Sequence, residues 1–305
     1  MTAVKPFATR SRFKGGKRPL SHIISDGLIV AVMWFVIVLT LYPFIYVLSM
    51  SISDPQYVVE DVIWLFPKGF SLESYARVFD NPDIWTAYGN TLFYAGVGTL
   101  LNILFTVLAA YPLSRRTFSL RTPIIILVTI TMFFGGGLIP NFLLIKELGL
   151  YNTRWAILLP GLTSAFYIII TRTFFQSIPE SLQESARIDG ANDIGILMRI
   201  ILPLSQPILA VLALFYAVGH WNSYFTAMIY LPDVKLQPVS LYLVKVLVQD
   251  QQSMMEGMMN QYDRALISVQ LKYSMIIVTI LPILFIYPFL QKYFVKGVMI
   301  GSLKE

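Results

Sequence analysis

Six stretches without a formally charged residue limit what this chain can fold into. They cover residues 27–53, 84–114, 122–145, 155–171, 200–232 and 273–291. An apolar run of about 20 residues can cross the hydrocarbon core of a bilayer as a helix. Of the 305 residues, 56% are hydrophobic and 13% are charged, which is typical of multi-span membrane proteins. The sequence therefore predicts an all-α integral membrane protein with six transmembrane helices.

The predicted organisation contains no separate soluble domain. Residues 1–26 form a basic tail, residues 27–53 the first helix, residues 84–294 a core of five further helices, and residues 295–305 a C-terminal tail. Lys and Arg gather in both tails, in the loop after the second run and around residues 172–199, whereas the loop after the first run is acidic. Because Lys and Arg are enriched in cytoplasmic loops, we expect both termini in the cytoplasm. The net charge of +6 then indicates contact with anionic membrane lipid and not with nucleic acid.

A charged stretch at residues 180–203 separates the fourth and fifth runs and is predicted to form two short helices joined by a turn. Pro179 favours a helix start, and Ser181 with Glu184 has the spacing of a capping box. Gly190 can adopt the positive φ that a tight reversal needs. A short helical pair between membrane spans is expected to dock on a partner.

The second short helix is predicted from its cap and its apolar spacing. Asn192 or Asp193 can cap it. Ile194, Leu197 and Ile201 have the spacing of one helical face. Pro203 is then expected to stop or redirect the chain.

The sequence lacks the motifs of several kinds of catalytic, nucleotide-binding and metal-binding site. The chain has no cysteine, no phosphate-binding GxxxxGK[ST] loop, no HExxH metal motif and no GxSxG nucleophile motif. Its two histidines, His22 and His220, lie in different segments. We therefore expect no enzyme activity, no metal and no bound cofactor in this chain.

No Asp, Glu, Lys or Arg lies in the middle of a predicted span. Proton-coupled and ion-coupled transporters usually need such a residue. Its absence predicts that energy comes from outside the spans, and it fits a neutral solute.

The end of the fifth run has residues that suit a sugar. They are Tyr216, His220, Asn222 and Tyr224. Tyr216, His220 and Tyr224 have i, i+4, i+8 spacing, and aromatic rings with polar edges can cover C–H surfaces and bond hydroxyls. An interfacial aromatic belt is the alternative, and Trp221 and Tyr230 look like belt residues.

Two other segments have more than one interpretation. Three consecutive glycines, residues 135–137, with Pro140 are expected to break or flex the third helix, which could line a cavity or simply permit close packing. The long outer loop at residues 232–271 includes a methionine cluster at 254–259. It could touch a substrate or a binding protein, or form a folded cap.

The stretch between the fourth and fifth runs resembles the EAA coupling loop of ABC importer permeases. The matching positions are Glu184, Ala186, Asp189, Gly190, Ala191, Leu202, Pro203 and Pro207, with Ser185 in place of a second alanine. The chain as a whole resembles the carbohydrate-uptake branch, through Trp221-Asn222 and residues 291–297 and 301–304. Residues 136–140 and 149–152 are similar to the sub-branch that imports complex oligosaccharides.

This resemblance implies a type I importer permease fold with a cytoplasmic coupling helix between helices 4 and 5. It implies a second homologous permease chain, two ATP-binding subunits that bind ATP and Mg, an extracytoplasmic solute-binding protein and a sugar substrate. The residues expected to couple to an ATPase are Glu184, Ser185, Ala186, Asp189, Gly190, Ala191, Ile194, Leu197 and Pro203. The alternatives are an ABC permease for amino acids or peptides and an ATP-independent channel.

Overall fold

A computed structural model describes residues 20–60, 62–256 and 269–286, and side chains at 24–60, 62–248 and 269–286. Every regular element in this part of the chain is helical, which confirms the predicted all-α class. Residues 1–19 of the predicted N-terminal tail (1–26) and the predicted C-terminal tail (295–305) lie outside the described residues. The methionine cluster at 254–259 and the family-like segments at 291–297 and 301–304 lie outside the residues with described side chains.

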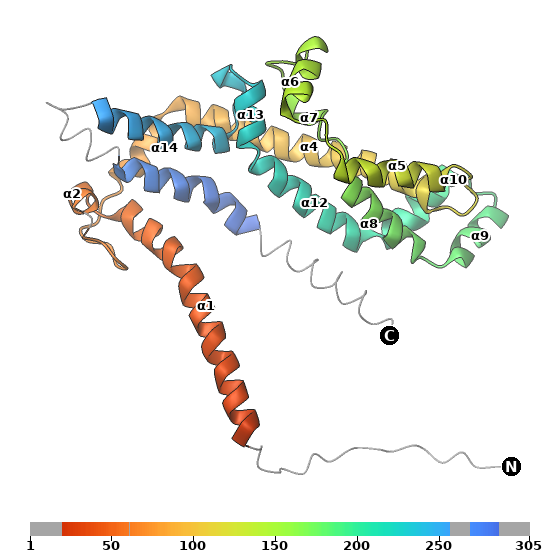
Figure 1. The fold of residues 1–305 in the computed structure, drawn as a ribbon, viewed down its shortest axis with the longest axis horizontal. Helices are drawn as coiled ribbons and strands as arrows, with labels where there is room; N and C mark the ends of the chain where they lie inside the picture. The colour runs from red at the N-terminus through yellow and green to blue at the C-terminus, as the bar shows by residue number, and fades with distance from the viewer. Residues whose placement is uncertain (1–19, 61, 257–268, 287–305) are drawn as a thin grey trace.

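The long helix α4 (Pro82–Ser114) is the axis of the bundle (Figure 1). Asn81 caps it by accepting a hydrogen bond from the Asp83 amide, and Pro82 occupies the first turn, where no intrahelical N–H bond is lost. Helices α8 (Ala165–Gln176) and α12 (Gln206–Trp221) pack along α4. Thr106 and Ala110 of α4 are fully buried against these neighbours, and Tyr94 is buried in a separate cluster with residues of α7, α13 and α14.

Three helices of the described chain are long and apolar enough to span a membrane, and two bent helix pairs raise that number to five. The three are Ile24–Ile52 within α1 (Leu20–Ile52), α4, and the last described helix, Val269–Ile286. The pairs are α5 (Arg121–Phe133) with α6 (Leu138–Glu147), bent by 114°, and Asp193–Leu204 with α12, bent by 81°. The six predicted spans are therefore not six continuous helices.

Each discontinuous run has a local cause. Between α5 and α6 lie the glycines at 135–137, and Gly137 has φ +81°, which confirms the predicted break. The run at 155–171 is divided into α7 (Trp155–Leu158) and α8 around Pro160 and Gly161. The run at 200–232 bends at Ser205, after α11 (Leu202–Leu204), and again before α13 (Tyr224–Tyr230). The predicted redirection near Pro203 is confirmed.

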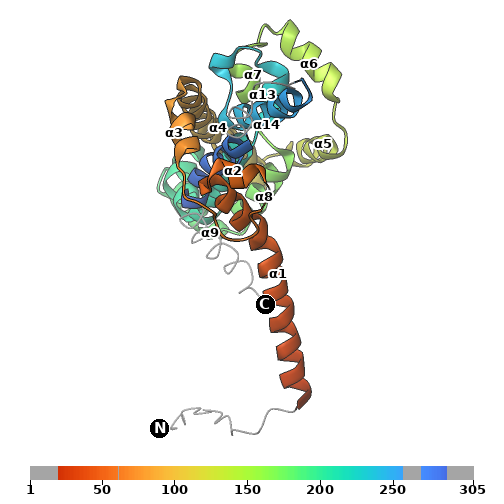
Figure 2. The same ribbon diagram turned by 90° about the vertical axis from the view of Figure 1, so that its left-hand side faces the viewer.

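Helix α1 projects away from the bundle, as Figures 1 and 2 both show. The most apolar window of its span is 0% buried. Its last turns pack on the described bundle, where Ser49 Oγ donates to the Leu65 carbonyl and Met50 is buried. The most apolar part of the first predicted span is therefore not covered by the part of the chain that the structure describes.

One end of the bundle holds α2 (Pro55–Val59), α3 (Glu73–Asp80) and α14 (Val239–Glu256). The segment predicted as a long outer loop thus contains the short helix η2 (Val234–Leu236) and the helix α14, which packs on α4 and α13. The described part of this segment is therefore largely helical and packed on the bundle, as in the folded-cap alternative.

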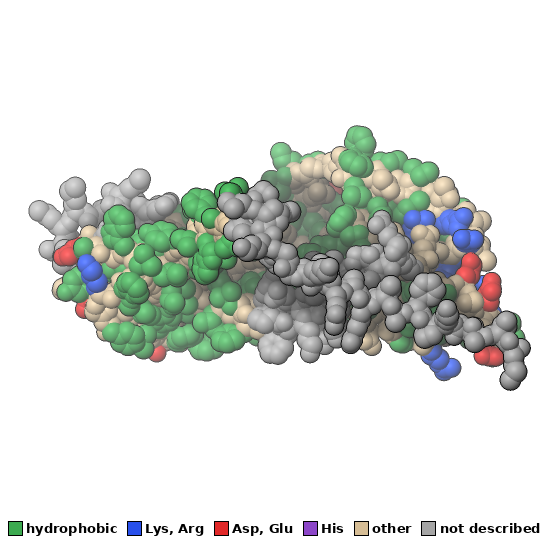
Figure 3. All heavy atoms as spheres, turned by 90° about the horizontal axis from the view of Figure 1, so that it is seen from below, with side chains coloured by type: hydrophobic (Ala, Val, Ile, Leu, Met, Phe, Trp, Pro, Cys, Tyr) green, Lys and Arg blue, Asp and Glu red, His purple; other side chains and the backbone are tan. Residues whose placement is uncertain are grey.

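The opposite end holds α9 (Glu180–Ile188), α10 (Asp193–Ile196) and the π-helical turn η1 (Leu197–Ile201). On the face shown in Figure 3, hydrophobic side chains cover much of the described surface between the two ends, and charged side chains gather toward the ends. This distribution is the one expected of a protein that crosses a membrane along its long axis.

Candidate functional site

The turn between α9 and α10 is a helix C-cap of the Schellman type. Gly190 has φ +84°, its amide donates to the Arg187 carbonyl at 3.0 Å, and the Ala191 amide donates to the Ala186 carbonyl at 2.9 Å. Ala186 and Ala191 are half-buried against the same core cluster. The predicted positive φ at Gly190 is confirmed, and the small residues around it allow the turn to lie close to that core.

The capping of the two short helices differs partly from the prediction. Helix α9 begins at Glu180 with Pro179 as its N-cap, and no side chain caps it. The capping box of Ser181 and Glu184 is therefore wrong, because Ser181 already lies inside the first turn. Asn192 caps α10 as predicted, with its side-chain oxygen 2.8 Å from the Gly195 amide nitrogen.

The second short helix has two apolar faces instead of one. Ile196, Leu197 and Ile201 are buried in the cluster beneath the loop. Ile194 and Met198 of this helix are 72% and 59% exposed, and Ile188 at the end of α9 is 86% exposed. The prediction that Ile194, Leu197 and Ile201 share a face is wrong, because a π-helical turn begins at Leu197 and changes the helical register.

Contacts with the end of α4 hold this loop in place. The Tyr111 hydroxyl donates to the Asp193 carbonyl at 3.0 Å, and Arg187 pairs with the Asp193 carboxylate across the turn at 3.3 Å. The Arg115 guanidinium lies 4.5 Å from the centre of the Tyr111 ring, and burial lowers its pKa. The loop is thus a fixed extension of the bundle, and the term coupling loop below means residues 180–203.

The predicted coupling residues differ in how far their side chains are exposed. Glu184, Ser185, Asp189, Gly190, Ile194 and Pro203 are exposed, Ala186 and Ala191 are half-buried, and Leu197 is buried. Glu184 lines a polar cavity of about 430 Å³ together with Arg115, Arg116, Arg121 and Arg187. Leu197 can therefore support the loop from within, whereas Ile188 and Met198, which the sequence reasoning missed, belong to its exposed apolar face.

A second polar region lies halfway along the bundle, in a cavity of about 400 Å³ that we call the central cavity. Its lining comprises Asn102, Ile157, Pro160, Gly161, Tyr167, Phe215, Tyr216, Gly219, His220, Ser223 and Thr226. Tyr216 and His220 are brought together here as predicted. Asn222 and Tyr224 are exposed and do not line it, because α12 ends at Trp221 and Asn222 caps that end. The predicted common face of Tyr216, His220 and Tyr224 is therefore wrong.

Aromatic rings form one wall of the central cavity. Tyr167 stacks on Phe215 with centroids 5.9 Å apart, and it meets Tyr216 edge to face at 4.8 Å. The Tyr216 hydroxyl lies 2.7 Å from the Thr106 hydroxyl of α4. This combination of ring faces and hydroxyl groups can cover the C–H surface of a sugar and bond its hydroxyls.

Sequence reasoning missed the polar residues that α4 brings to the middle of the bundle. Asn90, Tyr94, Asn102 and Thr106 lie at positions spaced by four, and Gly98 occupies the position between Tyr94 and Asn102. The Asn102 amide donates to the Gly161 carbonyl, and its oxygen lies 2.6 Å from His220 Nε2. The spacing of four within a charge-free run is the signal that could have revealed this stripe.

The predicted belt residues are buried and not lipid-facing. Trp221 is 5% exposed and donates from Nε1 to the Thr279 carbonyl at 3.3 Å. Tyr230 is 6% exposed and stacks on Phe142 of α6. Both belt assignments are wrong, because contacts with other helices cover these rings.

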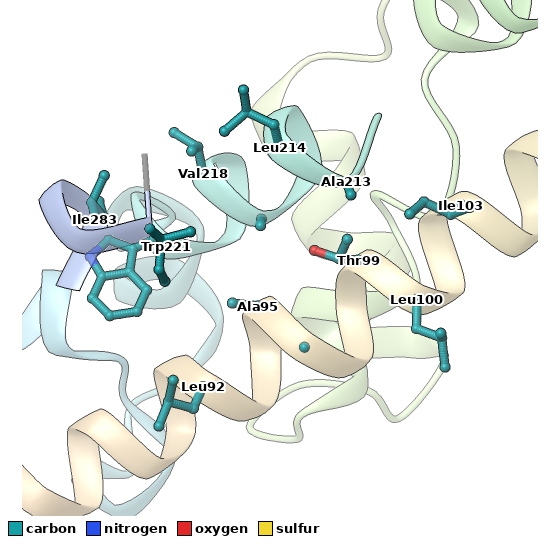
Figure 4. Close-up of a pocket in the computed structure, with 13 residues that line it drawn as sticks. Leu92, Ala95, Thr99, Leu100, Ile103, Ala213, Leu214, Val218, Trp221 and Ile283 are labelled. Atoms are coloured by element: carbon teal, nitrogen blue, oxygen red, sulfur yellow. The ribbon is translucent and has the colours of Figure 1, made fainter. Parts of the chain in front are cut away.

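Two further cavities lie along the bundle. One of about 550 Å³, between α6 and α13, shares the lining residues Pro160 and Thr226 with the central cavity. The other, of about 430 Å³, lies between α4, α12 and the last described helix (Figure 4). Among the side chains labelled there, only Thr99 carries an oxygen and only Trp221 a nitrogen, so this apolar cavity does not suit a sugar.

Comparisons with known proteins agree with this architecture. Residues 102–300 match the family model described as "Binding-protein-dependent transport system inner membrane component". The chain is 40% identical to the polygalacturonan/rhamnogalacturonan transport system permease protein YtcP of Bacillus subtilis (strain 168), over 93% of this chain and 100% of that protein. It is also 40% identical to Protein LplC of the same organism, over 87% and 90% of the two chains.

A solved structure has the same fold over nearly the whole chain. It belongs to a bacterial ABC transporter involved in the import of the acidic polysaccharide alginate. The TM-score is 0.83 at 34% identity, covering 95% of this chain and 100% of the other. With the family model and the relatives above, this protein belongs to the family of binding-protein-dependent transport system inner membrane components.

Proposed function

We propose that this chain forms half of the translocation path of an ATP-driven importer that carries oligosaccharides into the cell. Family membership makes it a multi-pass permease subunit of an ABC importer for sugars. The remaining parts of the proposal are its partners, its orientation, its coupling residues and the kind of saccharide.

The coupling loop is the observation that carries the proposal. One face of this helical pair is fixed on α4 through Tyr111 and the buried isoleucines, and the other presents Ile188, Ile194 and Met198 to the outside. Exposed apolar patches of this kind mark contacts with other proteins. An ATP-binding subunit that closes on ATP binding would hold this face in a groove and move the bundle with it.

The proposed machine contains four subunits and a delivery protein. A second, homologous permease completes the path, two ATP-binding subunits bind ATP and Mg and hydrolyse ATP, and an extracytoplasmic solute-binding protein presents the saccharide. Both termini and the coupling loop face the cytoplasm. ATP binding favours an outward-open arrangement and hydrolysis returns the inward-open one, so the ATPases shift a population between two rigid states.

The central cavity is the proposed saccharide contact of this chain. Its described lining offers aromatic rings, hydroxyls, an amide and an imidazole, but no Asp, Glu, Lys or Arg. The relatives named for polygalacturonan, rhamnogalacturonan and alginate point to oligosaccharides that contain uronic acids. This proposal replaces the expected neutral solute, with counter-charges supplied by the second permease.

The test is the ATPase activity of the reconstituted complex with its binding protein across a panel of saccharides. We expect galacturonate oligomers to stimulate hydrolysis, and neutral glucose oligomers of the same length to serve as the matched control. Stimulation by amino acids or peptides instead would overturn the sugar assignment. A failure of ATP-binding chains to copurify would favour an ATP-independent channel.

A further inference from the structure

Asn102 is the most buried amide side chain beside the central cavity. It is 1% exposed, although it lies in the middle of a charge-free span of α4. A polar side chain in such a position is costly unless hydrogen bonds satisfy it. Both ends of the amide are satisfied here, and each bond reaches a different segment: the Gly161 carbonyl between α7 and α8, and His220 Nε2 on α12.

The chemistry of these partners determines which atom donates and which accepts in each of the two hydrogen bonds. A backbone carbonyl can only accept, so the Asn102 atom facing Gly161 is the NH₂ group. The Asn102 atom facing His220 is then the side-chain oxygen, which can also only accept. Consequently His220 Nε2 must carry a hydrogen. In a neutral imidazole the other nitrogen, Nδ1, is then unprotonated and is an acceptor.

The backbone of α4 holds the imidazole in this position. Gly98 lies one turn before Asn102, and a Cβ there would be 2.7 Å from His220 Cε1 and 2.8 Å from Cδ2. These distances are shorter than any ordinary carbon contact. The ring therefore occupies space that only a glycine leaves free, and it is held between Gly98 and Asn102.

We infer that Asn102 is a positioning residue that holds His220 in its Nε2–H tautomer, so that Nδ1 accepts a hydrogen bond from a saccharide hydroxyl. Saccharide hydroxyls can donate, and the nearby Tyr216 hydroxyl is already engaged with Thr106. No charged side chain lines the described central cavity to compete for the imidazole. This inference rests on the proposed function, because it takes the central cavity as part of the saccharide path.

The chain itself makes the spectroscopic test simple. It has two histidines, so His22→Gln leaves His220 as the only ¹⁵N-histidine signal of the permease. The full complex, with unlabelled partner subunits, would be reconstituted in lipid nanodiscs and studied by solid-state ¹⁵N NMR. We expect one protonated nitrogen, Nε2, and one unprotonated nitrogen, Nδ1. Protonation at Nδ1 alone, or at both nitrogens, would overturn the inference.

Two further measurements separate positioning from simple packing. In Asn102→Leu, which has similar volume but no polar atoms, we expect the single-tautomer spectrum to be lost. In the wild-type complex, a saturating galacturonate oligomer presented by the binding protein should move the Nδ1 resonance toward that of a hydrogen-bonded acceptor. If Asn102→Leu does not assemble, the spectra of the complex with Asn102 intact, with and without saccharide, test the inference alone.

The outcomes also distinguish this inference from the proposed function. Saccharide-stimulated ATP hydrolysis with an unchanged Nδ1 resonance would contradict the role of His220 and would still support the proposed importer function. If no saccharide stimulates hydrolysis, the proposed function itself fails. A wild-type tautomer that persists in an assembled Asn102→Leu complex would show that Asn102 does not set it.

Discussion

The hydroxyl groups of Thr106 and Tyr216 lie 2.7 Å apart and join α4 to α12 beside the central cavity. Both residues are buried, Thr106 at 0% and Tyr216 at 7% exposure. A hydrogen bond between two buried hydroxyls holds the helices at one height, and Tyr216 is the side-chain partner of the Thr106 hydroxyl.

Removing one of these hydroxyls is expected to cost more than removing both. Tyr216→Phe leaves the Thr106 hydroxyl buried without its partner, at a cost of about 1–3 kcal/mol in the free energy of unfolding. Thr106→Val combined with Tyr216→Phe should recover much of that loss. The double-mutant cycle is measured from the unfolding of the purified complex in detergent. Simple additivity of the two single changes would show that the hydroxyls are not coupled.

Gly98→Ala tests the close contact between α4 and the His220 ring. The added methyl group would collide with the imidazole, so we expect destabilisation of about 1–3 kcal/mol, as for other overpacked cores. Gly89→Ala on the same helix is the matched control, because nothing lies within 4 Å of its added Cβ. Thermal unfolding of the two variants gives the comparison. Equal stability would mean that the ring moves aside without cost.

Gly190 is expected to be the least replaceable residue of the coupling loop. At φ +84° a residue with a Cβ is strained, by about 1–2 kcal/mol, although nothing lies within 4 Å of the added atom. Gly190→Asp adds a charge to this strain at the proposed ATPase contact and should uncouple the complex. Copurification of the ATP-binding subunits and uptake into membrane vesicles are the readouts.

Two further variants serve as comparisons for Gly190→Asp. Gly190→Asn has nearly the same shape without the charge and tolerates positive φ, so it should retain more uptake. Glu184→Ala should also be milder, because Glu184 is exposed and is not needed for the turn. Full uptake with Gly190→Asp at normal expression would remove the loop from the coupling mechanism.

The exposed apolar face of the coupling loop makes a separate prediction. Ile194→Asp places a charge on a side chain that is 72% exposed, so the permease should insert and fold normally. Binding of the ATP-binding subunits should fall, because an apolar contact is replaced by a desolvated charge. Ser181→Asp, on an exposed position of α9, is the control. Pull-down of the ATP-binding subunits at equal permease levels measures the difference, and equal recovery would contradict the docking role.

The topology can be tested directly because the chain has no cysteine. We expect a cysteine in place of Ser181 to be shielded from an impermeant thiol reagent in intact cells. A cysteine in place of Val234, exposed at the opposite end, should react. Cysteines replacing Ser11 and Ser302 report on the two termini. Reaction of the Ser181 variant from outside would reject the predicted orientation.

Local chemistry explains what could be predicted from the sequence. The turn at Gly190 and the cap at Asn192 depend on atoms within a few residues of each other, so their pattern is visible along the chain. The glycines at 135–137 likewise predict the break before α6, because glycine itself has a wide range of backbone conformations. The family resemblance of the coupling loop rests on the same short-range pattern.

Tertiary context explains the failures. The spacing of Ile194 and Leu197 assumed a uniform α-helix, whereas a π-helical turn starts between the exposed and the buried residue. Tyr224 was aligned with His220 on the assumption that α12 continues, but α12 ends at Trp221. The role of Asn102 depends on a carbonyl 59 residues away and a ring 118 residues away, which no local pattern specifies.

The exposure of α1 has a consequence for how such a subunit is made. The most apolar window of its span is 0% buried by the described bundle, so folding of the remaining described helices leaves most of this helix uncovered. A subunit produced in excess would keep a complete span surrounded by lipid alone and open to membrane proteases. Matched synthesis of the subunits is then a structural requirement, and surplus chains carry a built-in mark for removal.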